Sequence, residues 1–529
     1  MRNAAGFLPP GAPFYGIPQG SVFAVDGAGL GPAEAVSREA SADSPLGREL
    51  AAVSIKITAA GGTAVDAILY SVSANRVTAI LPAAAPVGNG TVVLTYDGRA
   101  SAAVPIRIVA SAFGFSSVDG SGVGGAAPRI GGVEGDRVAF LNAANPGETL
   151  VFEGTGLGAD SNDETMPIDG AANLADLPFE VYFGYVKAEV TYRGRSKRPG
   201  WDRVDVVVPE GIDGCYTSVY SKTRGDVVSN TVTVAVAPAA AGRVCKEFGF
   251  RPTNYEEVFS RSAVNAAWYY LGQFITSIPA TGPIPASTTV TDAANAQFVR
   301  YDTFQFSNYG GRGEPGYGSC VVTTALGELV VVPIEIKALD AGPSIGLTLP
   351  NGNEIRLPKQ TPITSYVYSS GPPTRPLFIP AGGGTFKFSA PGGEDVGAHE
   401  ATIRTTAPVR WTNRSMITAV NRSSNLEITW TGGEEDSYLI IYGASTNGAN
   451  PPLITSFNCA ERTSAGRFVV PRDILASMGP SFAVPGPFSI PTGQLALINY
   501  RIPAKFEAQG IDVGNISYYV WDATQVTYQ

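Results

Sequence analysis

The chain has 529 residues and a net charge of −9, which excludes a nucleic-acid-binding protein, because phosphate recognition needs a basic face and no Lys/Arg-rich run is apparent. With 62 Gly and 40 Pro, about a fifth of the chain disfavours helices, whereas 44% hydrophobic residues exclude a disordered chain. Many short strands joined by tight turns satisfy both observations, and the length suffices for about three to four domains.

The composition also favours a location outside the cell. Only 16% of the residues are charged, and Ser, Thr, Asn and Gly supply the polar surface, which is common in exported proteins. No window approaches roughly 18 uninterrupted apolar residues, so no transmembrane segment is predicted. The first residues, MRNAAGFLPP, lack the apolar core of a signal peptide. We therefore expect an extracellular or cell-surface protein whose signal peptide has already been removed.

The first part of the chain is predicted to form an arm and one sandwich. Residues 1–19 are expected to be an extended amino-terminal arm, because four prolines fix backbone angles and remove hydrogen-bond donors. Residues 20–112 contain about six short segments with alternating or β-branched residues between turns. This pattern predicts an antiparallel β-sandwich of the immunoglobulin type.

A second copy of the same pattern follows. The segment at 147–158, GETLVFEGTGLG, has the same pattern as the segment at 20–31, GSVFAVDGAGLG, at an offset of 127 residues. Residues 203–209 are similar to residues 76–82 at the same offset. Two distant blocks in one register indicate a duplicated unit. Residues 113–240 are therefore predicted to form a second immunoglobulin-like sandwich.

The remainder, residues 241–529, keeps the β composition but loses the repeat. We expect a larger β-rich region, either one body or two sandwiches with a boundary near residue 405. Residues 254–275 fit a helix capped by Asn254, but their aromatic and β-branched content also fits a strand, and both alternatives remain open. Asn351-Gly352 predicts a hairpin. The last residues, 516–528, are strongly β-prone and must pair with another strand.

The four cysteines, Cys215, Cys245, Cys320 and Cys459, are an even, sparse set that fits two disulfides and lacks the close pairs of a zinc site. We favour Cys215 with Cys245, which would tie a strand of the second repeat to the segment leaving it. Cys320 with Cys459 would then close a long loop in the last region. The alternative is four buried free thiols in a cytosolic protein.

Several motifs together resemble a known family. Asn3-Ala4-Ala5, the two blocks ending in Gly-x-Gly-Leu-Gly, and Gly214-Cys215 followed by Ser229-Asn230-Thr231-Val232 are similar to a family of uncharacterised, secreted bacterial β proteins with IPT/TIG-like repeats, over residues 3–245. The resemblance implies export and β-sandwich structure, supports the favoured cysteine pairings, and implies no catalytic residue. The carboxy-terminal part is similar to a module that trails such repeats, through Gly318-Ser319-Cys320, Leu339-Asp340-Ala341-Gly342-Pro343, Trp411-Thr412-Asn413, Thr429-Trp430-Thr431 and Phe457-Asn458-Cys459.

The chain has one histidine, His399, which restricts the possible catalytic arrangements. The pentapeptide at 342–346 matches G-x-S-x-G around Ser344, and Asp395 and His399 follow in hydrolase order. The motif requires a strand, a turn and a helix, whereas Ser344 leads into the hairpin at Asn351-Gly352. We therefore expect no catalytic triad, no enzyme and no cofactor, with His399 an exposed or hydrogen-bonded strand residue.

Acidic and aromatic residues offer two further candidates. Asp160, Asn162 and Asp163 could bind calcium, but Thr165 stands where an EF-hand loop requires Gly, so a solvated loop is the preferred interpretation and no metal is predicted. The tryptophans could stack on sugars if two shared an exposed face, although core packing is the simpler interpretation.

The predicted function follows from these exclusions. We expect a non-enzymatic extracellular structural or assembly protein, a subunit of a filament, sheath or surface layer. It would self-associate through its amino-terminal arm, its carboxy-terminal strand or a sheet edge. The alternative is a monomeric surface adhesin or carbohydrate-binding protein with a glycan as its partner.

Overall fold

The computed structural model describes residues 1–168, 173–245, 258, 261–280, 285–302, 315–327, 336–360, 365–371, 375–484 and 490–529. The fold is all-β, with 52% of the residues in strands and 3% in helices. It divides into two compact units. Unit 1 comprises Met1–Arg243 and Val322–Leu326, and unit 2 comprises Val244–Val321 and Gly327–Gln529. Within the described residues, no helix is long and apolar enough to cross a membrane.

The first immunoglobulin-like repeat of unit 1 consists of two packed sheets. The alternation of β6, VSIKITA, buries Val53, Ile55 and Ile57 and turns Lys56 outward, as a half-buried strand requires. One sheet has the order β1 (Arg2–Asn3), β3 (Val22–Asp26), β9 (Arg76–Ile80), β8 (Ile68–Val72) and β4 (Val36–Ser37). The other has the order β2 (Ile17–Pro18), β12 (Val104–Val109), β10 (Gly88–Tyr96), β6 (Val53–Ala59) and β5 (Glu49–Leu50), with β11 (Arg99–Ala100) beside β10 and β7 (Ala64–Asp66) beside β6.

The amino-terminal segment is not a free arm, which corrects the expectation for residues 1–19. Strand β1 pairs with β3, and β2 pairs in parallel with β12. Ile17 is fully buried, and the Asn3 side chain donates to the Thr155 carbonyl at 2.9 Å while accepting the backbone N–H groups of Ala5 and Gly6. Proline suits such edge positions, because an edge strand leaves donors unused. The segment is therefore part of the core of unit 1.

Replacing Asn3 with alanine should lower the free energy of unfolding of unit 1 by about 1–3 kcal/mol, because buried backbone groups lose their only side-chain partner. Urea unfolding would measure this loss. Asn89→Ala is the control, since Asn89 is exposed on β10, and a change within about 0.5 kcal/mol is expected there. Equal effects of the two substitutions would show that the amino-terminal segment does not contribute to the core.

The second repeat preserves the pairing of the first. In repeat 1, β3 pairs with β9, and Val22 lies opposite Ile80. In repeat 2, β16 pairs with β19, and Thr149 lies opposite Val207. Each residue of the second pair follows its counterpart by 127 positions, the offset of the repeated sequence. The duplication predicted from sequence is therefore present as equivalent neighbouring strands. The sheet order is β13 (Gly114–Phe115), β16 (Thr149–Thr155), β19 (Asp202–Val207), β18 (Val186–Arg195), β17 (Phe179–Phe183), β20 (Gly214–Thr223), β22 (Val232–Val236) and β14 (Gly124–Gly125), with β15 (Arg129–Ile130) beside β16 and β21 (Val227–Val228) beside β20.

A buried ion pair lies within repeat 2, next to the second Gly-x-Gly-Leu-Gly block. Arg195 is 2% exposed, and its Nη1 lies 2.5 Å from Oδ1 of Asp202, which is fully buried. The other Asp202 oxygen accepts the backbone N–H groups of Gly156 and Leu157 at 2.7 and 2.8 Å. Gly156 has a φ of +117°, and a Cβ there would lie 2.3 Å from the Ala112 carbonyl, so the second Gly-x-Gly-Leu-Gly block is a turn that cradles a carboxylate.

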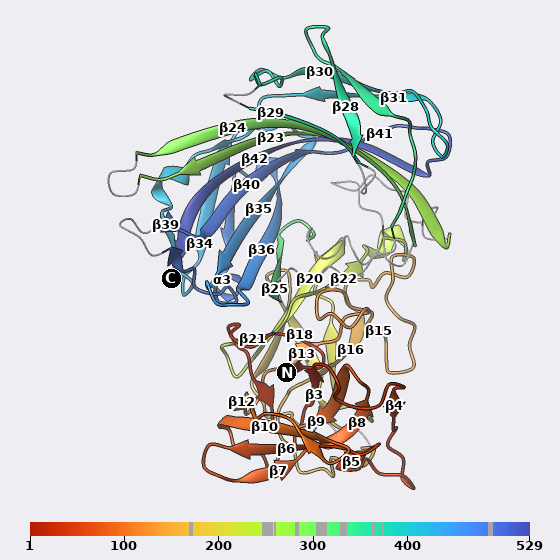
Figure 1. The fold of residues 1–529 in the computed structure, drawn as a ribbon, viewed down its shortest axis with the longest axis vertical. Helices are drawn as coiled ribbons and strands as arrows, with labels where there is room; N and C mark the ends of the chain where they lie inside the picture. Colours follow the sequence, from red (N-terminus) through yellow and green to blue (C-terminus); the bar gives the residue numbers. More distant parts are fainter. Residues whose placement is uncertain are drawn as a thin grey trace. The chain divides into compact units, whose positions relative to one another are not determined.

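Apart from Val322–Leu326 of its first strand, which unit 1 includes, one 15-stranded sheet belongs to unit 2, and three of its strands, each of 16 residues, lie side by side (Figure 1). Its order is β25 (Ser319–Leu326), β36 (Leu453–Arg462), β35 (Ser437–Thr446), β40 (Gly493–Arg501), β42 (Val513–Tyr528), β23 (Ala263–Ile278), β24 (Ser287–Asp302), β29 (Ser365–Ser370), β28 (Glu354–Gln360), β27 (Ser344–Thr348), β30 (Gly384–Ala390) and β31 (His399–Thr405), with β26 (Lys337–Ala338), β33 (Ala419–Val420) and β41 (Ala504–Lys505) paired off this path.

Smaller elements complete unit 2, and one helical turn follows repeat 2. They are β32 (Arg410–Trp411), β34 (Leu426–Thr431) and β37 (Arg467–Val470) in one sheet, β38 (Ala483–Val484) with β39 (Ile490–Pro491), the short helices η2 (Arg414–Met416), η3 (Thr463–Ala465) and α3 (Arg472–Ala476), and η1 (Ala239–Ala241) after repeat 2.

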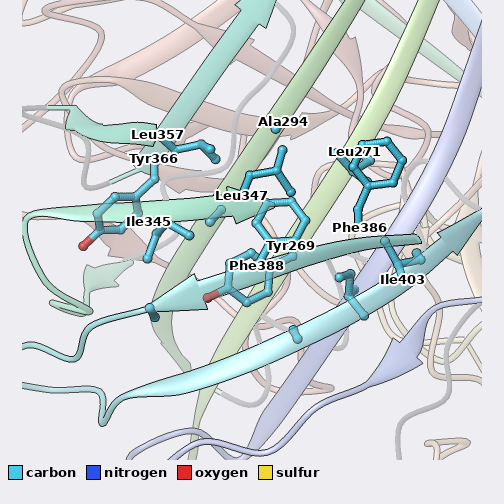
Figure 2. Packing of buried hydrophobic residues seen from close by; sticks show 14 of the residues in the cluster. Tyr269, Leu271, Ala294, Ile345, Leu347, Leu357, Tyr366, Phe386, Phe388 and Ile403 are labelled. Carbon is cyan, nitrogen blue, oxygen red and sulfur yellow. The ribbon is translucent and has the colours of Figure 1, made fainter. Parts of the chain in front are cut away.

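The sheet of unit 2 folds over onto itself to make a large core. Tyr269 and Leu271 of β23 pack against Leu347 of β27 and Phe388 of β30, and all four side chains are fully buried (Figure 2). The Tyr269 and Phe388 rings stack with centroids 4.5 Å apart. Strands on both sides of residue 405 therefore belong to one sheet, and the structure does not divide the region there.

Two expectations for unit 2 are resolved in the structure. From Ala263 onward the ambiguous segment is strand β23, while residues 254–257 lie outside the described residues. The carboxy-terminal strand β42 does pair, but inside the chain, between β23 in parallel and β40 in antiparallel orientation. The Asn351-Gly352 hairpin joins β27 to β28, with Gly352 at a φ of +85°.

Candidate ligand-binding groove

The histidine of the hydrolase-like string has a structural role. His399 begins β31, and its ring stacks on Phe506 at 5.2 Å. Nδ1 lies 2.8 Å from the Gly397 carbonyl, to which it must donate, so Nε2 accepts from the Tyr269 hydroxyl at 2.8 Å. Asp395 accepts the backbone N–H of Asp340 at 2.8 Å. Both ring nitrogens are therefore occupied, His399 is the expected hydrogen-bonded strand residue, and no Ser-His-Asp arrangement forms with Ser344.

The burial of His399 makes unit 2 sensitive to acid. Burial lowers the pKa of His399 below its ordinary value of 6.5, although the hydrogen bond with Gly397 opposes this shift. The unfolded chain therefore binds a proton more readily than the folded chain. Stability from this site is present above about pH 6.5 and is lost as the pH falls toward the lowered pKa.

We expect the free energy of unfolding to fall more steeply between about pH 7 and about pH 5 in the native protein than in a His399→Gln variant. Urea unfolding at several pH values would measure both slopes. Identical slopes would contradict the assigned neutral state of His399.

The calcium candidates are committed to other partners. The Asp160 carboxylate pairs with Arg195 Nε at 3.1 Å and accepts the side-chain amides of Asn162 and Asn173 at 2.9 and 2.6 Å. Asp163 instead accepts the backbone N–H and hydroxyl of Thr165 at 2.9 and 2.7 Å. In the described part of the chain, no group of three or more His, Cys, Asp or Glu gathers in a way that could hold a metal ion.

All four cysteines are oxidised, so the two expected disulfides are present. One joins Cys320 of β25 to Cys459 of β36, across 139 residues of sequence. Cys215 and Cys245 are also disulfide-bonded, and both are buried. These bonds stabilise the fold and leave no free thiol among the cysteines.

Two tryptophans and a row of tyrosines in the described part of unit 2 pack against other groups of the protein. Trp411 and Trp430 are buried. On one face of the large sheet, Tyr438 and Tyr500 stack with centroids 5.2 Å apart and an interplanar angle of 10°, and Tyr519 continues the row 5.3 Å from Tyr500. Rings that stack on one another cover their own faces. The row therefore stabilises neighbouring strands as cross-strand pairs do.

A groove of about 310 Å³ lies on repeat 2. Residues of β16, β19 and the end of β18 line it, together with residues from the segments at 116–118, 126–137 and 196–198. Glu153 of β16 faces Arg203 of β19 in register, and Arg203 lies over the Tyr192 ring at 4.6 Å. The groove thus combines carboxylate, guanidinium and aromatic surface in one concavity, which is typical of ligand sites.

Several interactions hold the groove side chains in place. Arg203 Nε donates to Asp205 at 2.7 Å, which fixes the guanidinium above Tyr192. The Tyr192 hydroxyl donates to the Arg195 carbonyl at 3.1 Å, and burial raises the pKa of Tyr192 above its ordinary value, so the phenol stays neutral. Arg195 itself is locked by its two buried carboxylates. A site of this kind is organised before a ligand arrives.

Sequence reasoning missed this groove because its lining comes from separate parts of repeat 2. One signal was available: Arg193, Arg195, Lys197 and Arg198 form a basic run that the expectation of no Lys/Arg-rich segment overlooks. Two of these side chains, Lys197 and Arg198, are exposed at the groove. Only the register of β16 with β19 shows which other residues share the site.

No protein-family model matches the chain, and no curated protein matches it. Among solved structures, the chain is similar to SGBP-B of the Bacteroides ovatus mixed-linkage glucan utilization locus in complex with a mixed-linkage heptasaccharide, at 11% identity over 67% of this chain and 71% of that chain, with a TM-score of 0.20. A tetra-tandem repeat from the extending region of a large adhesion protein is 12% identical over 96% of each chain, with a TM-score of 0.13.

Sidekick-1 immunoglobulin domains 1–4 are 8% identical over 96% of this chain and 100% of that chain, with a TM-score of 0.13. TM-scores this low carry no argument about ligands or partners. The function must therefore be argued from the residues of this chain.

Proposed function

We propose that this chain is a non-catalytic binding protein of the cell exterior, with its ligand site in the groove of repeat 2. The observation that carries the proposal is the convergence of Tyr192, Arg203 and Glu153 in one preorganised concavity of about 310 Å³. The most hydrolase-like residues, by contrast, are used in structural hydrogen bonds. The disulfides support a location in an oxidising compartment.

The rigid connection between the repeats suits such a role. Side chains of repeat 1 tie it to repeat 2, because Asn3 donates to the Thr155 carbonyl and the Tyr70 hydroxyl donates to the Pro199 carbonyl. A fixed pair of sandwiches holds the groove in one geometry, and a preorganised site loses less entropy on binding.

Assembly into a filament, sheath or surface layer is not what we propose first. The two terminal segments that were expected to pair with a neighbour are paired within the chain, at β1, β2 and β42. A polymer would therefore have to use exposed sheet edges. Electron microscopy of the purified chain tests this alternative, since fibres would favour assembly and dispersed particles would favour the binding protein.

The proposed function is tested by filling the groove. Val133 lines the groove and is 40% exposed, so Val133→Trp adds bulk there without disturbing the core. Val87→Trp is the matched control, because Val87 is 56% exposed on repeat 1. On a glycan array, we expect the native protein and Val87→Trp to bind the same glycans and Val133→Trp to lose them. Unchanged binding by Val133→Trp would place the site elsewhere.

A further inference from the structure

We infer that the groove of repeat 2 binds an acidic saccharide, one whose carboxylates alternate with hydroxyl groups, as in a uronic-acid chain. This inference rests on the proposed function and specifies its ligand. Arg129, Arg137, Lys197 and Arg198 line the groove, and within the described residues none of them forms an ion pair with a carboxylate. On a chain of net charge −9, such a concentration of unneutralised cations points to an anionic ligand.

Two of these guanidiniums are already oriented. Arg129 Nη1 donates to the Gly135 carbonyl at 2.8 Å, and Arg137 Nη1 donates to the Ala127 carbonyl at 3.3 Å. Each bond uses one N–H group and leaves the others for a ligand. A planar guanidinium held in this way matches a carboxylate, which it can bind through two parallel hydrogen bonds.

The groove also offers apolar surface and hydrogen-bond acceptors. Val118 and Val133 line it with 41% and 40% of their surface exposed. The C–H faces of a sugar ring can cover such surface. Glu134 and Glu153 are exposed at the groove and can accept hydroxyl protons.

The same two carboxylates argue against a densely charged ligand. Nucleic acid places a phosphate at every nucleotide and would be repelled by Glu134, Glu153 and the acidic chain as a whole. A uronic-acid saccharide brings carboxylates to the arginines, hydroxyl donors to the glutamates and an apolar ring face to the two valines. Each lining group then has a partner.

The test is isothermal titration of the full chain with a polygalacturonate oligosaccharide and with its methyl ester, which has the same backbone without the charge. We expect the acid to bind, with affinity falling as salt is raised, and the ester to bind at least about tenfold more weakly, because charge-assisted hydrogen bonds are lost. The double variant Arg137→Glu/Lys197→Glu should weaken binding of the acid, and this loss of affinity should exceed the loss caused by methyl esterification of the ligand.

The control is Lys56→Glu/Arg107→Glu, which changes the net charge equally at two exposed positions of repeat 1. It should bind the acid like the native protein. The inference would be overturned if the acid and the ester bound equally, or if the two double variants had equal effects. It would also be overturned if the protein preferred dextran sulfate to polygalacturonate, or if single-stranded DNA competed for the site. If a neutral glycan binds and Val133→Trp abolishes it, the acidic ligand is wrong while the proposed function stands. If no glycan binds, the acidic ligand is wrong; if glycans bind to the native protein and to Val133→Trp equally, the proposed function is wrong as well.

Discussion

Asp202→Ala is expected to lower the free energy of unfolding of unit 1 by about 3–5 kcal/mol, the range measured when one partner of a buried ion pair is removed. The substitution would remove from Arg195, which is 2% exposed, the nearer of its two ion-pair carboxylates. It would also leave the backbone N–H groups of Gly156 and Leu157 without the carboxylate that they now bind. Urea unfolding, with hydrogen exchange of the β19 amides, would measure the loss.

Asp26→Ala is the matched control for this substitution. Asp26 pairs with two arginines, Arg2 at 2.8 Å and Arg76 at 2.7 Å, but its side chain is 32% exposed. Water screens such a pair, so its loss should cost no more than about 1 kcal/mol. If the two substitutions had equal effects, the buried pair would contribute no more to the stability of unit 1 than the exposed one.

Removal of the Cys320–Cys459 disulfide by a Cys320→Ala/Cys459→Ala variant is expected to cost unit 2 about 2–5 kcal/mol. The bond spans 139 residues, so it restricts the unfolded chain strongly, and it ties the edge strand β25 to β36. Four of the five tryptophans belong to residues 244–529, and their fluorescence would follow unfolding in urea. Reduction of the native protein should reproduce part of the loss, whereas the variant should not respond at this site.

An unchanged unfolding midpoint in the double variant would contradict this expectation. Alanine is the suitable replacement because both cysteines are almost fully buried, and a serine hydroxyl would need a new partner there.

The elements that were predictable from sequence are those set by local pattern. The sequence similarity at an offset of 127 residues predicts the repeat, and the alternation of residues in β6 predicts which face of that strand is buried, because both patterns are set by neighbouring residues. The pairing of β23 with β42 joins residues about 250 positions apart, such as Trp268 and Asn515, and no local signal encodes it. The groove was equally hidden, since its parts converge only after folding.

The amino-terminal segment shows the same limit. Its prolines correctly indicated an extended backbone, but an extended conformation does not predict which other segments the backbone contacts. Asn3 is buried through contacts with Ala112 and Thr155, more than one hundred residues away. Burial of a polar side chain through distant carbonyl groups has no signature in the sequence around it.

The central claim is that an acidic saccharide binds in the groove of repeat 2, and hydrogen–deuterium exchange of the full chain with and without the polygalacturonate oligosaccharide tests it most directly. Saturation with the oligosaccharide should slow exchange at 116–118, 126–137 and 192–198, and should leave the strands of unit 2 unchanged. Binding that slows exchange only in unit 2, or only in repeat 1, would contradict the claim.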